Sequence, residues 1–516
     1  MQKDQLHKNI LFVPFIVILL LCSGCLTNTN VDNTPSTKDT LIFGVLSAET
    51  IYPLSVTNYN YWTLIPNIFN GLVEYDEQFR VIPSLAVTWN NPDSLTWRFY
   101  LRQGVKFHNG NNFTAEDVRY SIDRFNSGFD SFISDIIIVD NYTVEFKTFE
   151  PTPILLERLA HIGIIFCHND TEQPEGQALI GTGPYRLADY ELENYTVLER
   201  FDDYWGETPE IKTVVFKAIE DDEERLAALL SGTIDIAEYN VDDKIDQIMH
   251  EENITLVKYP PLSTYIIGFD LRENGSYGFP DGMNPTADIR VRKAIYQAIN
   301  ITPLINGPFK SLATPTSQLV TPYIFGYNSA IERLPYNITT SQQLLAEAGY
   351  EDGFDIVMDC ITEGFEYNAE NCYLITQQLA KIGIHVTMNN LSMTEFNKKV
   401  LFERNTSMYL YGWGEISMDG GWIYDLFVRS VGENLGSHNS GYYSNAEVDR
   451  LGIAASQEMD TYERLQLLQE GFRIALVDDV AVVPLLSQVL CTLTASDIEF
   501  IPRADLRVVV KDIRFT

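Results

Sequence analysis

Basic residues are scarce in this sequence. Its 516 residues include 36 Lys and Arg against 71 Asp and Glu, which gives a formal net charge of −35. Proteins that bind nucleic acids need a basic surface for the phosphates, so the charge balance predicts no nucleic-acid partner. An acidic surface of this kind is typical of a secreted protein that stays soluble.

Motifs for metal binding and catalysis are also missing. Beyond Cys22 and Cys25 the chain has no CxxC, and it has no HExxH, no GxSxG and no GxxxxGK[ST], while its seven histidines are scattered. Metal ligands and phosphate-binding loops depend on such spacings. The sequence therefore predicts no metal site, no cofactor and no enzymatic activity.

Long apolar runs are absent after the first thirty residues, and the run before that point is short. Ile10–Cys22 follows Lys3 and Lys8 and contains 13 residues, too few to cross about 30 Å of hydrocarbon. A charged start followed by a short apolar run is typical of a secretory signal peptide. Residues 1–24 are therefore predicted to be a signal peptide, and the body of the chain is expected outside the membrane.

Small residues lead from the apolar run to a second cysteine. The stretch Cys22-Ser23-Gly24-Cys25 resembles a lipoprotein box, which implies that Cys25 carries lipid. The Leu that usually stands three residues before the modified Cys is replaced by Cys22. Residues 25–40 are rich in Thr and Asn and are predicted to form a solvated tether. Ordinary signal cleavage and an uncleaved anchor are the alternatives.

Four further cysteines stand at positions 167, 360, 372 and 491, and disulfides are permitted outside the cell. Cys360 ends an apolar, strand-like stretch, and Cys372 begins a helix-like one. A return of the chain from strand to helix predicts a Cys360–Cys372 disulfide, with buried free thiols as the alternative.

Strand-like and helix-like patterns alternate along the chain. In the stretch LTWRFYL (95–101), Leu95, Trp97, Phe99 and Leu101 fall on one face. This period of two predicts a strand with one buried face.

A β-α-β unit is predicted over residues 213–237. The stretch 213–219 is strand-like, the acidic residues 221–224 suit a helix N-terminus, the helix ends at Gly232, and 233–237 returns as a strand. Such a unit implies a mixed or parallel sheet, so the fold class is predicted to be α/β.

Eight segments, in the expected order, resemble one protein family. They are the run from LAVTW (85–89) through LTWRFYLRQGVKFHNGNNFTAEDVRYSIDRF (95–125), then GTGPYRL (181–187), LERFDDYW (198–205), the segment Leu226–Ile236 with its SGTIDI end, RVRKAIYQAIN (290–300), LLAEAGYEDGF (344–354), QLAKIGIHV (378–386) and YYSNAEVDRL (442–451). Together they are similar to the signature of extracellular solute-binding proteins of the peptide/nickel class, the capture subunits of ABC importers. The resemblance covers the chain from about residue 40 onward, although Asn300 stands where the family usually has Asp.

The resemblance implies a two-lobed, periplasmic-binding-protein-like α/β fold, with a third subdomain inserted in the first lobe and a ligand cleft between the lobes. It places the first lobe at 41–264 with the insertion at about 70–180, the second lobe at 265–485, and the return to the first lobe at 486–516. The chain is expected to cross between the lobes near Tyr265–Asp270 and near Val483–Gln488.

Aromatic residues that line the cleft are also implied by the resemblance. They are Tyr59, Tyr61 and Trp62 in the first lobe, and Trp413 within the stretch 408–427 in the second lobe. Pocket walls that are aromatic, with a few polar anchors, are typical of ligand sites. Packing in the core is the alternative for each of these side chains.

The acidic anchor of the family is displaced in this chain. Peptide-binding relatives carry an Asp three residues after the Trp, which pairs with the peptide's ammonium group, whereas this chain has Ile416 there. Glu415 and Asp419 are the acids nearest that position. Either is predicted to replace the anchor, with solvated loop acids as the alternative.

The resemblance implies a monomeric, lipid-anchored binding subunit on the outer face of the cytoplasmic membrane, at the cell surface or in the periplasm. Its lobes would close over a small peptide, which it would deliver to ABC permease and ATPase subunits. A nickel chelate or an oligosaccharide is the alternative ligand. A secreted hydrolase and a surface receptor are alternatives of another class.

Overall fold

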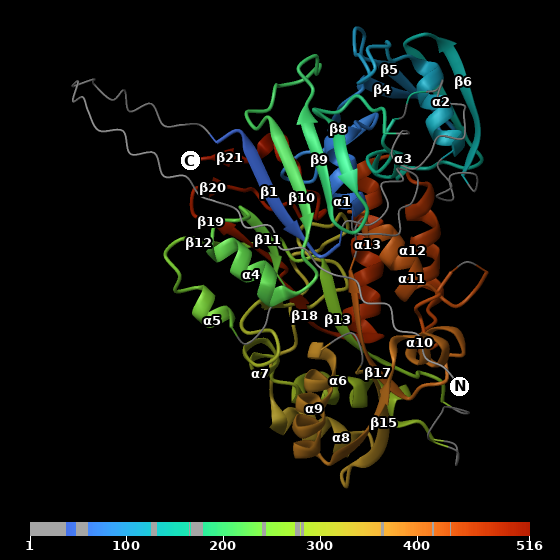
Figure 1. The fold of residues 1–516 in the computed structure, drawn as a ribbon. Coiled ribbons are helices and arrows are strands. Elements are labelled where there is room, and N and C mark those ends of the chain that lie inside the picture. Colours follow the sequence, from blue (N-terminus) through green and yellow to red (C-terminus); the bar gives the residue numbers. More distant parts are fainter. Residues whose placement is uncertain are drawn as a thin grey trace, which may run out of the picture. The chain divides into compact units, whose positions relative to one another are not determined.

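Two large mixed sheets and a smaller antiparallel sheet organise the chain (Figure 1). The computed structural model describes residues 38–47, 60–124, 132–164, 166, 179–239, 244–273, 279, 283–362, 366–414, 417–433 and 435–516, with backbone alone for 60–62, 124, 246, 366 and 367. The described residues belong to one unit, Lys38–Thr516. The predicted signal peptide, Cys25 and most of the predicted tether lie outside them.

The first large sheet has seven strands with β1 at its centre. In sheet order they are β12 (Ile254–Lys258), β19 (Cys491–Ala495), β11 (Ile236–Tyr239), β1 (Thr40–Val45), β10 (Thr213–Ala218), β9 (Tyr195–Arg200) and β8 (Tyr185–Glu191). Both β10 and β11 run parallel to β1, and α4 (Asp222–Leu230) connects them. Asp221 caps α4 by accepting from the Glu224 N–H at 2.9 Å. The predicted β-α-β unit is therefore confirmed, although its second strand begins at Ile236 and not at residue 233.

The second large sheet has six strands. In sheet order they are β14 (Ala313–Pro315), β18 (Val482–Gln488), β13 (Ser263–Phe269), β17 (Met408–Gly414), β15 (Phe354–Ile361) and β16 (Ile384–Leu391). Its helices are α6 (Ile289–Ala298), α7 (Thr302–Asn306), α8 (Ile338–Glu347), α9 (Glu366–Leu379) and α10 (Met393–Phe396). A disulfide joins Cys360 on β15 to Cys372 on α9, with 6.6 Å between the Cα atoms. Both cysteines lie in the hydrophobic core of this sheet.

The smaller sheet is antiparallel. Its order is β4 (Ala86–Asp93), β5 (Thr96–Leu101), β7 (Thr143–Thr148) and β6 (Ile133–Asp140), with α2 (Ala115–Arg124) packed on it. Trp97, Phe99 and Leu101 are buried, as the alternation predicts. The prediction was wrong for Leu95, which is 39% exposed. Its N–H donates to Asp93 Oδ1 at 2.9 Å, so it belongs to the turn before β5.

The remaining elements are short or helical. They are α1 (Asn60–Ile68), the hairpin β2 (Val73–Tyr75) and β3 (Val81–Pro83), α3 (Leu155–Leu159), α5 (Ile245–Ile248), α11 (Gly420–Phe427), α12 (Ala446–Gln457), α13 (Thr461–Arg473), the pair β20 (Ile498–Glu499) and β21 (Arg514–Phe515), the 3₁₀ turns Pro285–Ala287, Ala380–Ile382 and Val510–Asp512, and the π-helical turns Asn397–Phe402 and Ile474–Asp478. Figure 1 shows α11, α12 and α13 grouped together.

The chain passes between the two large sheets twice, and the two connections lie side by side. Residues 259–262 lead from β12 to β13, and 489–490 lead from β18 back to β19. The Tyr259 N–H donates to the Leu490 carbonyl at 2.9 Å, so one connection is hydrogen-bonded to the other. The strands expected to carry the crossings, β13 and β18, directly adjoin them.

We predict that Gly268→Ala in β13 destabilises the protein by about 1–3 kcal/mol, the usual cost of overpacking a core. An added Cβ would lie 2.0 Å from Cζ of Tyr409, whose ring is buried. Gly414→Ala in neighbouring β17 is the control, because its Cβ would meet no atom closer than 3.9 Å. Urea unfolding measures both variants. Equal stability of the two would contradict the packing argument.

Candidate functional site

Strand β17 and the loop that follows it form the core of the candidate site. β17 pairs with β13, with Trp413 opposite Thr264, and ends at Gly414. The chain is next described at Ser417, and α11 begins at Gly420. Glu415 and Ile416 lie outside the described residues.

An aromatic cluster surrounds Trp413. Its ring centroid lies 4.8 Å from His438, 5.8 Å from Phe427 and 5.9 Å from Trp422. Tyr411, two residues earlier on the same strand, stacks on Phe396 at 5.7 Å. Edge-to-face packing at such distances is favourable for aromatic rings.

The cluster contains polar groups as well as apolar ring surfaces, namely the indole N–H of Trp413 and the imidazole of His438. The indole N–H of Trp413 has no hydrogen-bond partner among the described residues. Trp422 is 40% exposed, so the cluster reaches the surface. Burial lowers the pKa of His438 to about 4, which keeps its imidazole neutral at pH 7. The cluster therefore presents an exposed aromatic side chain, Trp422, and a buried indole N–H without a partner among the described residues.

Asp419 is committed to the structure. Its carboxylate accepts from Arg464 Nη1 at 2.6 Å and Nη2 at 2.8 Å, and from the Gly421 N–H at 2.8 Å as the N-cap of α11. It is 3% exposed. A bidentate pair with Arg neutralises this carboxylate, so Asp419 has no free charge to offer the ammonium group of a ligand.

A second buried carboxyl, Glu157 of α3, faces the Asp419–Arg464 pair. Its Oε2 is buried without a hydrogen-bond partner among the described residues. Burial, and after it the charge of Asp419, raise the pKa of Glu157 to about 7 against the opposing effect of Arg464. The carboxyl is therefore protonated over much of the acidic range.

The β2–β3 hairpin contacts the same loop. The Tyr75 hydroxyl donates to the Ser417 carbonyl at 3.1 Å. At the hairpin turn, the ring of Phe79 lies 6.3 Å from that of Tyr323, edge to face. Tyr75 thus contacts Ser417, which lies 342 positions later in the chain and just before α11.

The structure locates only part of the predicted site. Trp413 lies in the aromatic cluster, and the backbones of Tyr61 and Trp62 lie in the first turn of α1. Their side chains, and all of Tyr59 and Glu415, lie outside the described residues.

Sequence reasoning missed several residues of the site. Trp422 falls within the predicted stretch 408–427 but was not singled out. His438, Tyr75, Glu157 and Arg464 stand in no motif, because their roles depend on contacts between distant parts of the chain.

No group of three or more His, Cys, Asp or Glu side chains among the described residues is placed to hold a metal ion. No helix in the described part of the chain is long and apolar enough to cross a membrane.

Comparison with protein families identifies the chain. It matches the model for bacterial extracellular solute-binding proteins, family 5 Middle, over residues 80–434, which are 355 of its 516 residues. The chain belongs to this family. The resemblance carried by the eight motifs is thereby confirmed, and the family consists of binding proteins rather than enzymes.

Named relatives of this family 5 protein bind small peptides. The glutathione-binding protein GsiB of Salmonella typhi is 25% identical over 453 residues, covering 84% of this chain and 86% of the relative. The dipeptide-binding protein of Escherichia coli strain K12 is 26% identical over 444 residues, covering 78% and 81%.

Solved structures share the fold. HbpA2 from Haemophilus parasuis aligns with a TM-score of 0.82 at 21% identity, over 92% of this chain and 100% of that chain. NikZ from Campylobacter jejuni in complex with Ni(L-His) aligns with a TM-score of 0.70 at 19% identity, over 92% and 99%. The predicted two-lobed, mixed α/β fold is confirmed by these likenesses.

We predict that Glu157→Gln changes how the stability of this family 5 protein depends on pH. In the native state the carboxyl holds its proton up to about pH 7, whereas the unfolded chain releases it near pH 4.5. Native protein thus binds more protons between these values, and wild-type stability falls as pH rises through them. The variant lacks this slope and is expected to be more stable at pH 8 by about 1–3 kcal/mol.

Urea unfolding at pH 4.5, 6 and 8 checks this, with the exposed Glu370→Gln as control. The two proteins should converge at pH 4.5. Lower stability of Glu157→Gln than of wild type at pH 8 would mean that the ionised carboxylate is stabilised by Arg464, and would contradict the prediction.

Proposed function

We propose that this chain is the lipid-anchored, extracytoplasmic binding subunit of an ABC importer that captures small peptides and delivers them to a membrane permease. The observation that carries the proposal is the Trp413 cluster, with its uncommitted indole N–H beside the loop that contains Glu415. The dipeptide- and glutathione-binding relatives support the choice of ligand.

Ligand capture would occur between two lobes, which we assign to residues 41–264 with 486–516 and to 265–485. A ligand shifts the balance toward a closed form only if it binds that form more tightly. The aromatic cluster and Glu415 would supply contacts from the second lobe, and Tyr59, Tyr61 and Trp62 from the first. The protein would act as a monomer that meets its permease and ATPase subunits at the membrane.

A nickel chelate is the second candidate ligand. The neutral imidazole of His438, 4.8 Å from Trp413, is a potential metal ligand beside the cluster. Because the described residues hold no metal-binding group of three, a small chelator would have to supply the remaining ligands.

We predict that Glu415→Gln lowers peptide affinity by about two to three decades. A carboxylate that pairs with the peptide's ammonium inside a closed cleft leaves that charge unpaired when it is neutralised, at a cost of about 3–5 kcal/mol. Isothermal titration calorimetry with free and N-acetylated dipeptides measures the effect. The exposed loop acid Glu433 provides the control, as Glu433→Gln.

Asp419→Asn is not a suitable control, because it would break the pair with Arg464. Equal binding of free and acetylated peptide by the wild type would show that no ammonium anchor exists. Binding heat with a mixture of nickel and histidine, together with no binding heat from any peptide, would favour the nickel chelate as the ligand.

We also predict that Cys25→Ser releases the protein from the membrane fraction. Each buried CH₂ of a lipid chain contributes about 0.8 kcal/mol to membrane binding, so removal of the lipid should abolish anchoring. Cell fractionation with immunoblotting measures the distribution, and Cys491→Ser, which changes a buried cysteine of the body, is the control. A Cys25→Ser protein that stays wholly in the membrane fraction would identify Ile10–Cys22 as the anchor.

A further inference from the structure

Asparagine is often followed, two positions later, by Ser or Thr in this chain. The sequence holds 34 Asn, and 65 of its 516 residues are Ser or Thr, so a random order would give about four Asn-X-Ser/Thr triplets. In a protein that leaves the cell, this triplet, with any residue except Pro in the middle, is the acceptor of N-linked sugar chains. Ten triplets occur, and they begin at Asn112, Asn141, Asn169, Asn194, Asn253, Asn274, Asn300, Asn337, Asn390 and Asn405.

The triplets follow the surface of the folded protein. Eight of their asparagines belong to the described residues; seven of these are exposed and Asn300 is half-buried. Triplets that arose without regard to the fold would occur at buried asparagines as well. Six asparagines among the described residues are buried, and none of them begins a triplet: Asn67, Asn70, Asn284, Asn368, Asn371 and Asn439.

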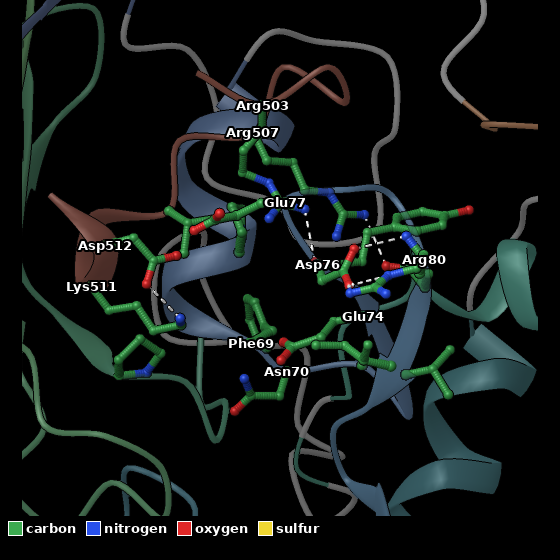
Figure 2. A pocket seen from close by; sticks show the side chains of 18 of the residues that line it. Phe69, Asn70, Glu74, Asp76, Glu77, Arg80, Arg503, Arg507, Lys511 and Asp512 are labelled. Carbon is green, nitrogen blue, oxygen red and sulfur yellow. Dashed lines mark hydrogen bonds and ion pairs between the residues drawn. The ribbon is translucent and has the colours of Figure 1, made fainter. Parts of the chain in front are cut away.

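The triplets are also absent from two places where side chains gather. None begins after Asn405, so the segment with Trp413 and helices α11, α12 and α13 has none. A cavity of about 380 Å³ lies between the C-terminal end of α1, the β2–β3 hairpin and residues 503–512 (Figure 2). Asn70, the asparagine in its lining, begins no triplet either. Sugar chains on the triplets would therefore be attached outside both places.

The third residue of the triplet divides the eight described triplets further. Because the triplet is defined by its hydroxyl residue, a transferase that acts on the folded protein has to reach that residue as well as the asparagine. Two of the third residues, Thr196 and Ser407, are buried. In four further triplets one end is half-buried. Both ends are exposed in the two that remain, 253–255 and 337–339.

The side chains of Asn253 and Asn337 differ in their contacts. Asn337 is the N-cap of α8, where its Oδ1 accepts from the Thr340 N–H at 3.0 Å. The Asn253 carbonyl accepts from the Ser496 N–H at 3.0 Å, which fixes its backbone. Its side chain makes no hydrogen bond with any described residue. Asn253 therefore has the less constrained amide of the two.

Asn253 also lies in the turn that leads into an outer strand. β12 is at the edge of the seven-stranded sheet, with β19 as its neighbour. The free edge of such a strand carries unpaired backbone groups that can pair with another chain, and proteins protect these edges by covering them. Ile254, Leu256 and Val257 of β12 are only half-buried. A bulky polar group at Asn253 would cover the start of this edge.

We propose that Asn253 carries an N-linked sugar chain that shields the outer edge of β12. The proposal rests on the extracytoplasmic location proposed above, where this triplet is used. The sugar donor is a lipid-linked sugar phosphate. The bond from its anomeric carbon to the phosphate oxygen breaks, and that carbon forms a bond to the amide nitrogen of Asn253. The amide gives up one proton to the departing phosphate, and no atom is oxidised or reduced.

Glycopeptide mass spectrometry of the protein purified from its own cells tests the site. We expect the peptide that contains Asn253 to carry the additional mass of sugar residues. The exposed asparagines Asn90 and Asn109, which begin no triplet, should carry none. An unmodified Asn253 would overturn the proposal. Sugar on Asn90 or Asn109 would overturn it too, because the triplet would then not decide the site.

Variants of Thr255 separate the triplet from the asparagine itself. Thr255→Ala should abolish the sugar on Asn253, whereas Thr255→Ser keeps the triplet and should preserve it. Light scattering at equal concentration then tests the shielding, since Thr255→Ala should aggregate faster than Thr255→Ser. Equal aggregation of the two variants would overturn the shielding role. Thermal melting of both variants checks folding.

This proposal and the proposed peptide binding fail separately. Thr255 stands apart from the Trp413 cluster, so both variants should bind peptide as the wild type does. A protein with sugar on Asn253 that binds no peptide would contradict the proposed ligand and support this inference. A protein that binds peptide and has no sugar on Asn253 would overturn this inference alone.

Discussion

Backbone pairing along the two connections is the constraint on which the arrangement of the large sheets depends. β12 leads into β13, and β18 leads back into β19. Each connection therefore joins a strand of the seven-stranded sheet to a strand of the six-stranded sheet. β12 is antiparallel to β19 and β13 to β18, and the Tyr259–Leu490 hydrogen bond links the connections between them. If one connection slid along the other, the backbone hydrogen bonds between β12 and β19 and between β13 and β18 would break. A rotation of one sheet relative to the other about the connections would keep these hydrogen bonds.

The loop between β17 and α11 is held by a buried charge network as well as by its strand. Asp419 caps α11 and pairs with Arg464, and the Tyr75 hydroxyl reaches the Ser417 carbonyl from the hairpin. Removing charges from water is costly, and the bidentate geometry of Arg464 offsets part of that cost. Glu157 adds a second carboxyl, whose Oε2 has no hydrogen-bond partner among the described residues, and this makes the region sensitive to pH. Ion pairs and hydrogen bonds therefore stabilise the residues next to the proposed peptide site, in addition to hydrophobic packing.

Two places on the molecule offer different recognition chemistry. The Trp413 cluster presents aromatic faces, an unpaired N–H and a neutral imidazole, which suit peptide side chains and backbone. The cavity between the β2–β3 hairpin and residues 503–512 is lined by four acidic and four basic side chains. The net charge of −35 does not predict this difference. Basic side chains occur at both places, where Arg464 pairs with Asp419 and Lys511 pairs with Asp512.

The sequence by itself determined the local elements and the family. The alternation in β5 and the acidic cap of α4 are features of a few consecutive residues, so hydrophobic period and turn chemistry predict them. The pairing of Cys360 with Cys372, which spans a short strand-to-helix return, could also be proposed, although free thiols stayed open. Other contacts follow from the tertiary structure alone. Tyr75 is hydrogen-bonded to Ser417, Asp419 is ion-paired with Arg464, and residues 503–512 line a cavity together with the β2–β3 hairpin. Those contacts join residues up to several hundred positions apart, and they depend on packing and desolvation that no local pattern encodes.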